Sequence, residues 1–220
     1  MPKFCYQGHG SYRFTANDGL VIYVDPYAGG DFTVKIHKML HPFPEKYKGG
    51  DYTLPADLIL VTHNHNDHNQ IQLVTPKPSC RIITHEEALA GGKHNSFEID
   101  SILIEAVEAG NLVHNPKRCV GYILTIDGVK IYCSGDTSKT KQMESFAQKR
   151  LDYAILCGDG KFNMGLKEAA ECAQIIGAKN NIIVHIALGA LFDRSKAERW
   201  QAPNKLIIEP GEEIEMMGAK

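Results

Sequence analysis

Residues 62–68 concentrate side chains that bind metal ions. The segment reads Thr-His-Asn-His-Asn-Asp-His and places three imidazoles and one carboxylate at His63, His65, Asp67 and His68. Imidazole and carboxylate are ligands that Zn²⁺ and related divalent cations take from proteins. Chance rarely produces this His-x-His-x-Asp-His pattern in a chain with ten histidines, so a polar surface loop is the weaker interpretation.

The spacing of these residues predicts the beginning of two adjacent metal sites. His63 and His65 are two positions apart, so on an extended backbone they project to the same side and can bind one cation. Asp67 and His68 are neighbours and would diverge on a regular strand, so the chain must turn there. That turn allows both residues to reach a second cation.

A further histidine, His185, closes the apolar segment Asn181 to Val184, which is typical of a buried strand. An imidazole at the end of such a strand is costly to bury unless its nitrogens have partners. A metal site would supply one partner, and a hydrogen-bonded core histidine is the alternative.

The elements that must position these residues recur along the chain. Two hairpins are predicted by Asp-Gly pairs at 18–19 and 127–128, a dipeptide that favours tight two-residue turns. The hairpins end at Asp25 and Asp136, and each is followed by an apolar run, at residues 57–61 and 152–156, that indicates a buried strand. This repetition predicts two similar halves, with coincidence between common hairpins as the alternative.

Helices are expected between these strands. Residues 166–176 place apolar side chains on one face and are followed by Gly177, which suits a helix C-terminus. Further helices are predicted at 138–150, 85–90 and 193–200, with Asp193 as an N-cap. The stretch from Lys35 to Thr53 lacks periodicity and is interpreted as a long surface loop. The chain is expected to form one α/β layered domain, residues 1–220.

Composition argues against several classes of function. The net charge of −2 and pI near 6.5 provide no overall positive field, so no nucleic-acid partner is expected. The first residues do not resemble a secretion signal, and no apolar run approaches the ~20 residues that span a bilayer. The six cysteines are widely spaced without a C-x-x-C pair, as suits a reduced compartment. A cytoplasmic protein without membrane attachment is predicted.

Nearly the whole chain resembles the metallo-β-lactamase superfamily, in the branch of small hydrolases similar to the ascorbate-6-phosphate lactonases. The resemblance is carried by the motif at 62–68 and by four further segments, which are residues 8–14, 24–26, 132–137 and 158–165. It implies an αββα sandwich of two similar halves, with helices outside two mixed β-sheets. It also implies a full set of metal ligands.

By this resemblance, His63, His65 and His114 would hold the first metal. Asp67, His68 and His185 would hold the second, and Asp136 would bridge both. Many relatives surround the third histidine with Gly-His-Thr-Pro-Gly, which this chain lacks, so His85 and His94 remain competitors of His114. Relatives often carry a tyrosine after the last histidine, where this chain has Ile186.

The positions of other polar residues are also predicted. His37 and His41 are expected at the surface, while the resemblance brings His9 toward the site in either a structural or a functional role. Asp25 and Asp57 are interpreted as carboxylates that fix loops or orient ligand imidazoles. The candidates for facing a substrate, each with a surface role as the alternative, are Asn64, Asn66, Lys161 and Asn163.

The predicted function is metal-dependent hydrolysis of a small molecule, most simply an ester or a lactone. Nitrogen and oxygen ligands without thiolate suit Zn²⁺, with Mn²⁺ and Fe²⁺ as alternatives. Two cations would activate a shared water as hydroxide and stabilise the developing oxyanion. Asp67 is the candidate catalytic residue, which would orient the hydroxide or carry a proton. A homo-oligomer is left open.

Three other functions compete with this prediction. A phosphodiesterase or nuclease of the same fold is disfavoured by the acidic balance of the chain. Di-iron flavoproteins of the family carry glutamate in place of His65 and need a flavin domain. Non-catalytic relatives tend to lose ligands, whereas the set here is whole.

Overall fold

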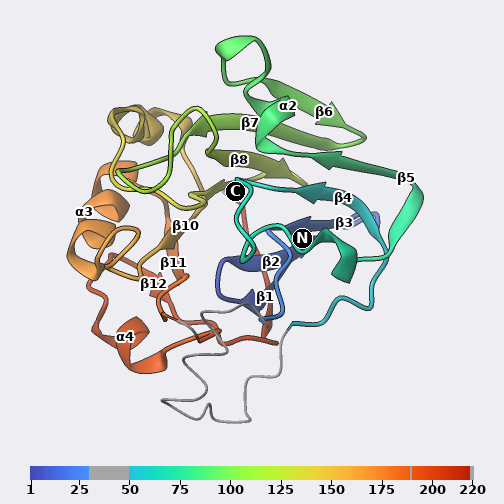
Figure 1. Cartoon of the computed structure of the whole chain (residues 1–220). Coiled ribbons are helices and arrows are strands. Elements are labelled where there is room, and N and C mark those ends of the chain that lie inside the picture. Colours follow the sequence, from blue (N-terminus) through green and yellow to red (C-terminus); the bar gives the residue numbers. More distant parts are fainter. Residues whose placement is uncertain (30–49, 189, 219–220) are drawn as a thin grey trace.

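The computed structural model describes residues 1–29, 50–188 and 190–218 of the chain. The loop predicted from Lys35 to Thr53 is described only from residue 50 onward, and His37 and His41 lie outside the described residues. Two mixed β-sheets pack together, and helices lie on their outer sides (Figure 1). The predicted α/β sandwich is confirmed.

The first sheet has six strands among the described residues, in the order β13-β1-β2-β3-β4-β5. The strands β1 to β3 and β13 pair antiparallel, whereas β3, β4 and β5 run parallel. Their bounds are β1 (Lys3–Gly8), β2 (Ser11–Thr15), β3 (Val21–Val24), β4 (Ala56–Leu60), β5 (Pro76–Ile83) and β13 (Glu213–Glu215).

The second sheet has seven strands within the described part of the chain, in the order β12-β11-β10-β9-β8-β7-β6. Here β6 to β9 pair antiparallel, and β9 to β12 run parallel. The bounds are β6 (Ser96–Ile99), β7 (Ile102–Glu108), β8 (Val120–Ile126), β9 (Val129–Cys133), β10 (Tyr153–Cys157), β11 (Asn180–Val184) and β12 (Lys205–Leu206).

The two sheets repeat one pattern, as the sequence predicted. The hairpin β2-β3 leads into the parallel strand β4, and the hairpin β8-β9 leads into the parallel strand β10. The apolar runs expected as buried strands form β4, β10 and β11, each one residue from its predicted position. This arrangement directs the loops after corresponding strands toward a common edge.

The helices follow the predictions with one correction. Helix α3 (Leu166–Ile176) has the predicted bounds, and Gly177 caps it at a φ of 67°. Helix α4 (Arg194–Arg199) begins after Asp193, whose carboxylate accepts the Lys196 N–H, and α2 is short (His85–Ala88). The segment expected as an α-helix over 138–150 instead forms the 3₁₀ helix η3 (Lys141–Lys149). Two further 3₁₀ turns are η1 (Ile71–Leu73) and η2 (Ala90–Gly92).

A physical reason for the 3₁₀ form lies in the spacing of the buried residues of η3. Met143 and Phe146 are three positions apart and both are fully buried. A 3₁₀ helix has three residues per turn, so it places these two side chains directly above one another. Phe146 packs edge-on against Tyr132 of β9, with ring centroids 5.0 Å apart.

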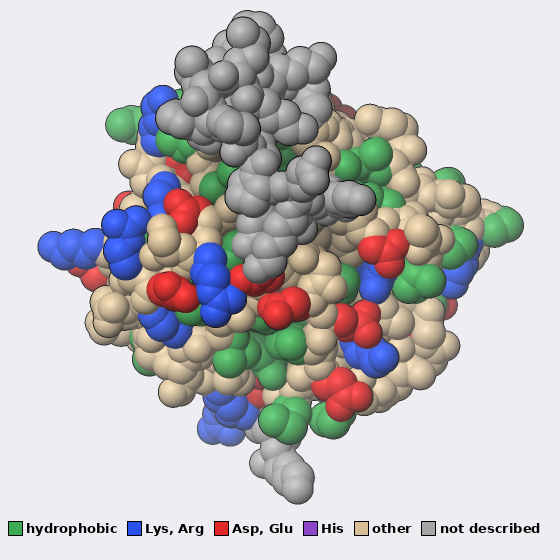
Figure 2. Space-filling view, turned by 90° about the horizontal axis from the view of Figure 1, so that it is seen from below, with side chains coloured by type: hydrophobic (Ala, Val, Ile, Leu, Met, Phe, Trp, Pro, Cys, Tyr) green, Lys and Arg blue, Asp and Glu red, His purple; other side chains and the backbone are tan. Residues whose placement is uncertain are grey.

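Charges of both signs share the described surface on the face that lies at the bottom of Figure 1. Seen from below, described lysine and arginine side chains are interspersed with aspartate and glutamate (Figure 2).

Five of the six cysteines are buried, Cys80 is half-buried, and all six are free thiols. None of the helices among the described residues has the length and hydropathy needed to cross a bilayer.

Candidate metal centre

The candidate metal ligands gather where parallel strands end. Asp25 follows β3 and the His63 to His68 loop follows β4. In the second sheet, a short turn after β9 carries Asp136, and His185 directly follows β11. Because the carboxyl ends of parallel strands share one edge of a sheet, both halves deliver polar side chains to the same region.

Strained backbone marks this region. Three non-glycine residues of the centre, His9, Asp25 and His185, have φ values of 56°, 48° and 49°. Such left-handed conformations cost free energy and persist where the surrounding structure enforces them, often at functional sites. Backbone hydrogen bonds supply that enforcement here, because His185 N–H donates to the His9 carbonyl at 2.8 Å.

His63, His65 and His114 form a first triad whose ligand nitrogens all lie within 4.8 Å of one another. The His63 Nε2 and His65 Nδ1 atoms are 3.1 Å apart. Thr62 Oγ1 lies 3.0 Å from His63 Nδ1, which leaves Nε2 to face the triad. His65 is exposed, whereas His63 and His114 are buried.

The loop before β8 brings His114 to the motif. Asn111 Oδ1 accepts the His114 backbone N–H at 2.9 Å and lies 3.1 Å from its ring Nδ1, so Nε2 is directed inward. A β-bridge between His63 and Cys119 joins the two segments. Of the competing histidines, His94 is exposed and joins no ligand cluster among the described residues.

Asp67, His68 and His185 form a second triad, and His9 lies beside it. Asp67 Oδ2 is 3.9 Å from His68 Nε2 and 3.7 Å from His185 Nε2. His9 Nε2 is 3.0 Å from the same oxygen, and its ring lies against that of His185 with centroids 3.7 Å apart. A side chain on Gly10 would come within 2.7 Å of His68 Cε1, so this close approach requires glycine.

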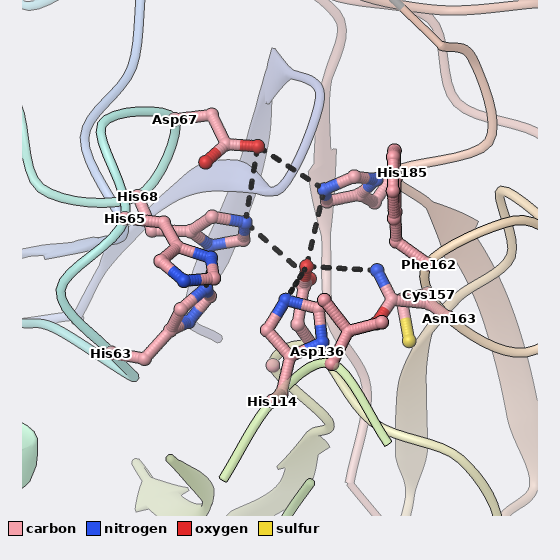
Figure 3. Close-up of polar contacts among 12 residues, drawn as sticks. His63, His65, Asp67, His68, His114, Asp136, Cys157, Phe162, Asn163 and His185 are labelled. Carbon is pink, nitrogen blue, oxygen red and sulfur yellow. Dashed lines mark hydrogen bonds and ion pairs between the residues drawn. The ribbon is translucent and has the colours of Figure 1, made fainter. Parts of the chain in front are cut away.

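The Asp136 carboxylate lies between the two triads, as Figure 3 shows. Its Oδ2 is 3.3 Å from His114 Nε2 and 3.4 Å from His185 Nε2, while its Oδ1 is 3.4 Å from His68 Nε2. Two ligand atoms about 2.1 Å from one tetrahedral zinc ion lie about 3.4 Å apart. The separations around Asp136 therefore suit atoms that share a cation.

Buried carboxylates orient the imidazoles of the second triad. Asp25 Oδ2 is 2.7 Å from His68 Nδ1 and also accepts the Thr62 hydroxyl at 2.6 Å. Asp159 Oδ2 lies 3.5 Å from His185 Nδ1. In each ring the other nitrogen, Nε2, is left to face the centre. Carboxylates behind ligand histidines fix ring orientation and raise basicity, as is usual at metal sites.

Burial and neighbouring charges shift the pKa values of the candidate ligands. Burial, reinforced by the nearby His68, lowers the pKa of His63 to about 2, and burial also lowers the pKa of His114. Burial favours the neutral forms of Asp67 and Asp136, but the surrounding imidazoles outweigh it and hold both pKa values far below normal. Burial opposes protonation of His68 and His185, but the carboxylates of Asp136 and Asp67 outweigh it and raise the pKa of both histidines. Neutral imidazoles and ionised carboxylates are the forms that bind metal, so a cation bound at the second triad would displace protons from these two rings.

The residues present fit a divalent cation. His68 Nε2, His185 Nε2 and Asp136 Oδ1 are buried atoms without a hydrogen-bond partner among the described residues. Buried polar atoms are costly when unsatisfied, and all three face the space between the triads. A cation would satisfy them. The donor set of imidazole and carboxylate suits Zn²⁺, Mn²⁺ or Fe²⁺.

Other sequence predictions receive mixed outcomes. Asp25 orients a ligand imidazole as expected, and Asp57 fixes loops by accepting the Val21 N–H and pairing with Lys77. Asn163 does not face open space, because its amide donates to Asp136 and Asp159 at 2.8 Å each.

The remaining substrate-facing candidates are exposed: Asn64 lines a cavity beside the first triad, whereas Asn66 and Lys161 do not line it and retain their surface alternative. Sequence reasoning missed Asp159 and Asn111. A signal existed for Asp159, since it follows the end of β10 as Asp25 follows β3.

Comparisons with known proteins identify the family of the chain. A family model described as the beta-lactamase superfamily domain matches residues 3–185. A metal-dependent hydrolase from Pyrococcus furiosus is 26% identical over 239 residues, covering 98% of this chain and 100% of that protein.

Solved structures show the same architecture. A protein from Parabacteroides distasonis with the provisional name of metal-dependent hydrolase is 29% identical, with a TM-score of 0.63 over 82% of this chain and 80% of that one. A metallo hydrolase from Ignicoccus hospitalis is 18% identical and superimposes with a TM-score of 0.69 over 97% of each chain. At that identity the second likeness concerns the fold alone.

Proposed function

Because the chain belongs to the metallo-β-lactamase superfamily and is a metal-dependent hydrolase, we propose that it hydrolyses a small ester or lactone at a dinuclear metal centre. The first triad would hold one cation and the second triad the other, with Asp136 shared between them. The likeness to ascorbate-6-phosphate lactonases stays a prediction within this proposal.

One observation carries the proposal more than any other. The buried Asp136 carboxylate approaches His114 of the first triad and both histidines of the second at 3.3 to 3.4 Å. A carboxylate that spans two ligand sets in this way is suited to bridge two cations. A single cation would leave one of the triads without a partner.

The bound cations would supply hydroxide at neutral pH and stabilise the oxyanion that forms on the substrate. The chain itself positions Asp67, whose Oδ2 faces the second triad and His9. Asp67 contacts His9, His68 and His185 through Oδ2, which leaves its other oxygen, Oδ1, for a different role, and the side chain is 28% exposed. That oxygen could orient the attacking water or pass a proton to the leaving group.

Zinc is the proposed metal because all seven ligands offer nitrogen or oxygen and no thiolate is present among them. Mn²⁺ and Fe²⁺ are alternatives, since imidazole and carboxylate do not select strongly among these ions. A small-molecule substrate is supported by the net charge of −2, which disfavours nucleic acid. Cytoplasmic location and a homo-oligomer stay predictions.

A substrate panel combined with elemental analysis tests the proposal. Purified protein is loaded with Zn²⁺, Mn²⁺ or Fe²⁺ and assayed on lactones, aryl esters, thioesters and phosphodiesters. We expect two metal ions per chain and the highest kcat/KM on esters or lactones. Preference for phosphodiesters would favour the nuclease alternative, and metal binding without turnover of any substrate would favour a non-catalytic role.

A further inference from the structure

A cavity of about 620 Å³ opens beside the first triad. His63, His65 and His114 all line it, so its contents would touch the first cation site directly. Sites for small molecules commonly have volumes of about 300–1,000 Å³. The cavity therefore has the place and the size of a substrate pocket.

Two cationic side chains, Lys117 and Arg118, line the same cavity. Neither forms an ion pair with a residue that the structure describes, whereas Arg81 is paired with Glu87 at 2.8 Å. The backbone beneath the two cations is ordered by Asn115, whose side chain accepts the Lys117 N–H and whose carbonyl accepts the Arg118 N–H. They are followed at once by Cys119, the bridge partner of His63, which ties them to the metal ligands.

The balance of charge in the cavity favours an anion. Glu86 is the one carboxylate among the described residues that line the cavity, against two cations. His85 also lines it, is buried, and has an Nδ1 without a hydrogen-bond partner among described atoms. Burial, with a smaller contribution from the charge of Arg118, lowers the pKa of His85 against the opposing charge of Glu86, so His85 adds little positive charge at neutral pH. Two cationic side chains without an ion-pair partner among the described residues suit a carboxylate or phosphate group.

The cavity also has apolar lining. Leu89 and Val113 contribute to its wall, and Val113 is 55% exposed although it is a large aliphatic residue. An exposed aliphatic side chain at the mouth of a polar cavity can be covered by the hydrocarbon part of a ligand. The ligand should therefore combine a short apolar body with a charged end.

We infer that this cavity is a substrate pocket in which Lys117 and Arg118 bind an anionic group, a carboxylate or a phosphate, of a small ester or lactone. The inference rests on the proposed function, because it assumes that the ester or lactone bond is hydrolysed at the first triad. It adds the substrate class, since neutral esters of the same size would be poorer substrates.

Two matched esters test the inference. The zinc-loaded enzyme is assayed with para-nitrophenyl butyrate, which is neutral, and with mono-para-nitrophenyl glutarate, which is anionic and has the same leaving group. We expect the ratio of kcat/KM, anionic over neutral, to fall about tenfold in the double variant Lys117→Gln, Arg118→Gln, mainly through KM. The reversed pair Lys117→Arg, Arg118→Lys should restore most of that ratio.

A matched control separates local from general charge effects. The double variant Lys141→Gln, Lys167→Gln removes two exposed cations that do not line the cavity. It should keep the wild-type ratio. An equal ratio in all variants, or an equal loss in the control, would overturn the inference while leaving ester hydrolysis intact.

A binding measurement covers the case in which neither ester is hydrolysed. Glutarate and inorganic phosphate are titrated into the zinc-loaded protein by calorimetry, and the stronger ligand identifies the favoured anion. A drop in affinity of about tenfold in the Lys117→Gln, Arg118→Gln variant would support the anion site even though the proposed reaction had failed. Unchanged affinity for both anions would reject the anion site.

Discussion

The two triads differ in how the protein holds them, although one loop begins both. In the first triad, the orienting groups are the neutral Thr62 hydroxyl and Asn111 amide, and His65 is exposed. In the second, the buried carboxylates of Asp25 and Asp159 lie behind the histidines. The same fold thus builds one open, weakly supported set of ligands and one enclosed, strongly supported set.

This difference indicates a division of labour. Carboxylates behind ligand imidazoles raise their basicity and commonly strengthen metal affinity by ten- to a hundredfold. The second triad should therefore bind its cation more tightly. The first triad faces the 620 Å³ cavity, so its cation would be the one that meets the substrate and exchanges with solvent.

Stepwise metal removal is expected to show the largest difference between the two triads. Dialysis against increasing chelator should remove the cation of the first triad before that of the second, with loss of nearly all hydrolytic activity at the first stage. Elemental analysis and activity assays on the same samples follow both events. Zinc added back is the control and should restore activity. Simultaneous loss of both ions would contradict the difference between the triads.

Replacing the shared carboxylate should disrupt both triads together. Asp136→Asn keeps the size of the side chain but removes the charge that balances His68, His114 and His185. We expect weaker binding of both cations and a fall in kcat/KM of at least about a hundredfold. The exposed Asp100, changed to Asn, is the matched control and should retain metal and activity. Loss of one cation alone would argue against the bridging role.

Substituting one orienting residue behind each triad tests how strongly that residue contributes to metal affinity. Asp25→Asn should lower affinity for the second cation by about ten- to a hundredfold, because a carboxylate behind His68 becomes a neutral amide. Asn111→Ala removes a neutral partner of His114 and should lower affinity for the first cation only several-fold. Competition with a zinc-sensitive dye measures both constants. Equal losses would show that carboxylate support does not distinguish the triads.

The Asp67→Asn variant should reduce rate with a smaller effect on metal content. The amide can still offer an oxygen to the second cation, but it is a poorer group for orienting water or carrying a proton. At saturating zinc we expect kcat to fall well over tenfold. Elemental analysis must show two ions per chain for the comparison to hold. An unchanged kcat would remove Asp67 from the catalytic role.

Local features were predicted well because local interactions decide them. The two-residue Asp-Gly turn at 127–128, the helix 166–176 with Gly177 at its end, and the Asp193 cap depend on residues close in sequence. The first hairpin is closed by the longer loop 16–20 instead of the predicted two-residue turn. Strand β13 at the C-terminus pairs with β1, more than 200 residues away, and no local sequence pattern predicts that pairing. The 3₁₀ form of η3 was missed because the packing of its buried side chains decides it.

The sequence by itself determined the chemistry of the centre. The types and spacing of His63 to His68 predict two adjacent cation sites, because backbone geometry decides which neighbouring side chains can share a cation. The resemblance added His114, Asp136 and His185 as expected partners. Whether these distant residues meet is a question of packing.

Only the tertiary structure decided how those ligands are arranged and supported. His185 reaches the motif because the two sheets pack together and align the ends of their parallel strands, and His114 reaches it through the loop between the antiparallel strands β7 and β8. The same packing places Asp159 behind His185 and Lys117 beside the cavity, which no short-range pattern encodes. Contacts between residues far apart in sequence depend on the burial of the whole core. The groups that orient the ligand histidines, and the charges that line the cavity, can therefore be identified only in the folded molecule.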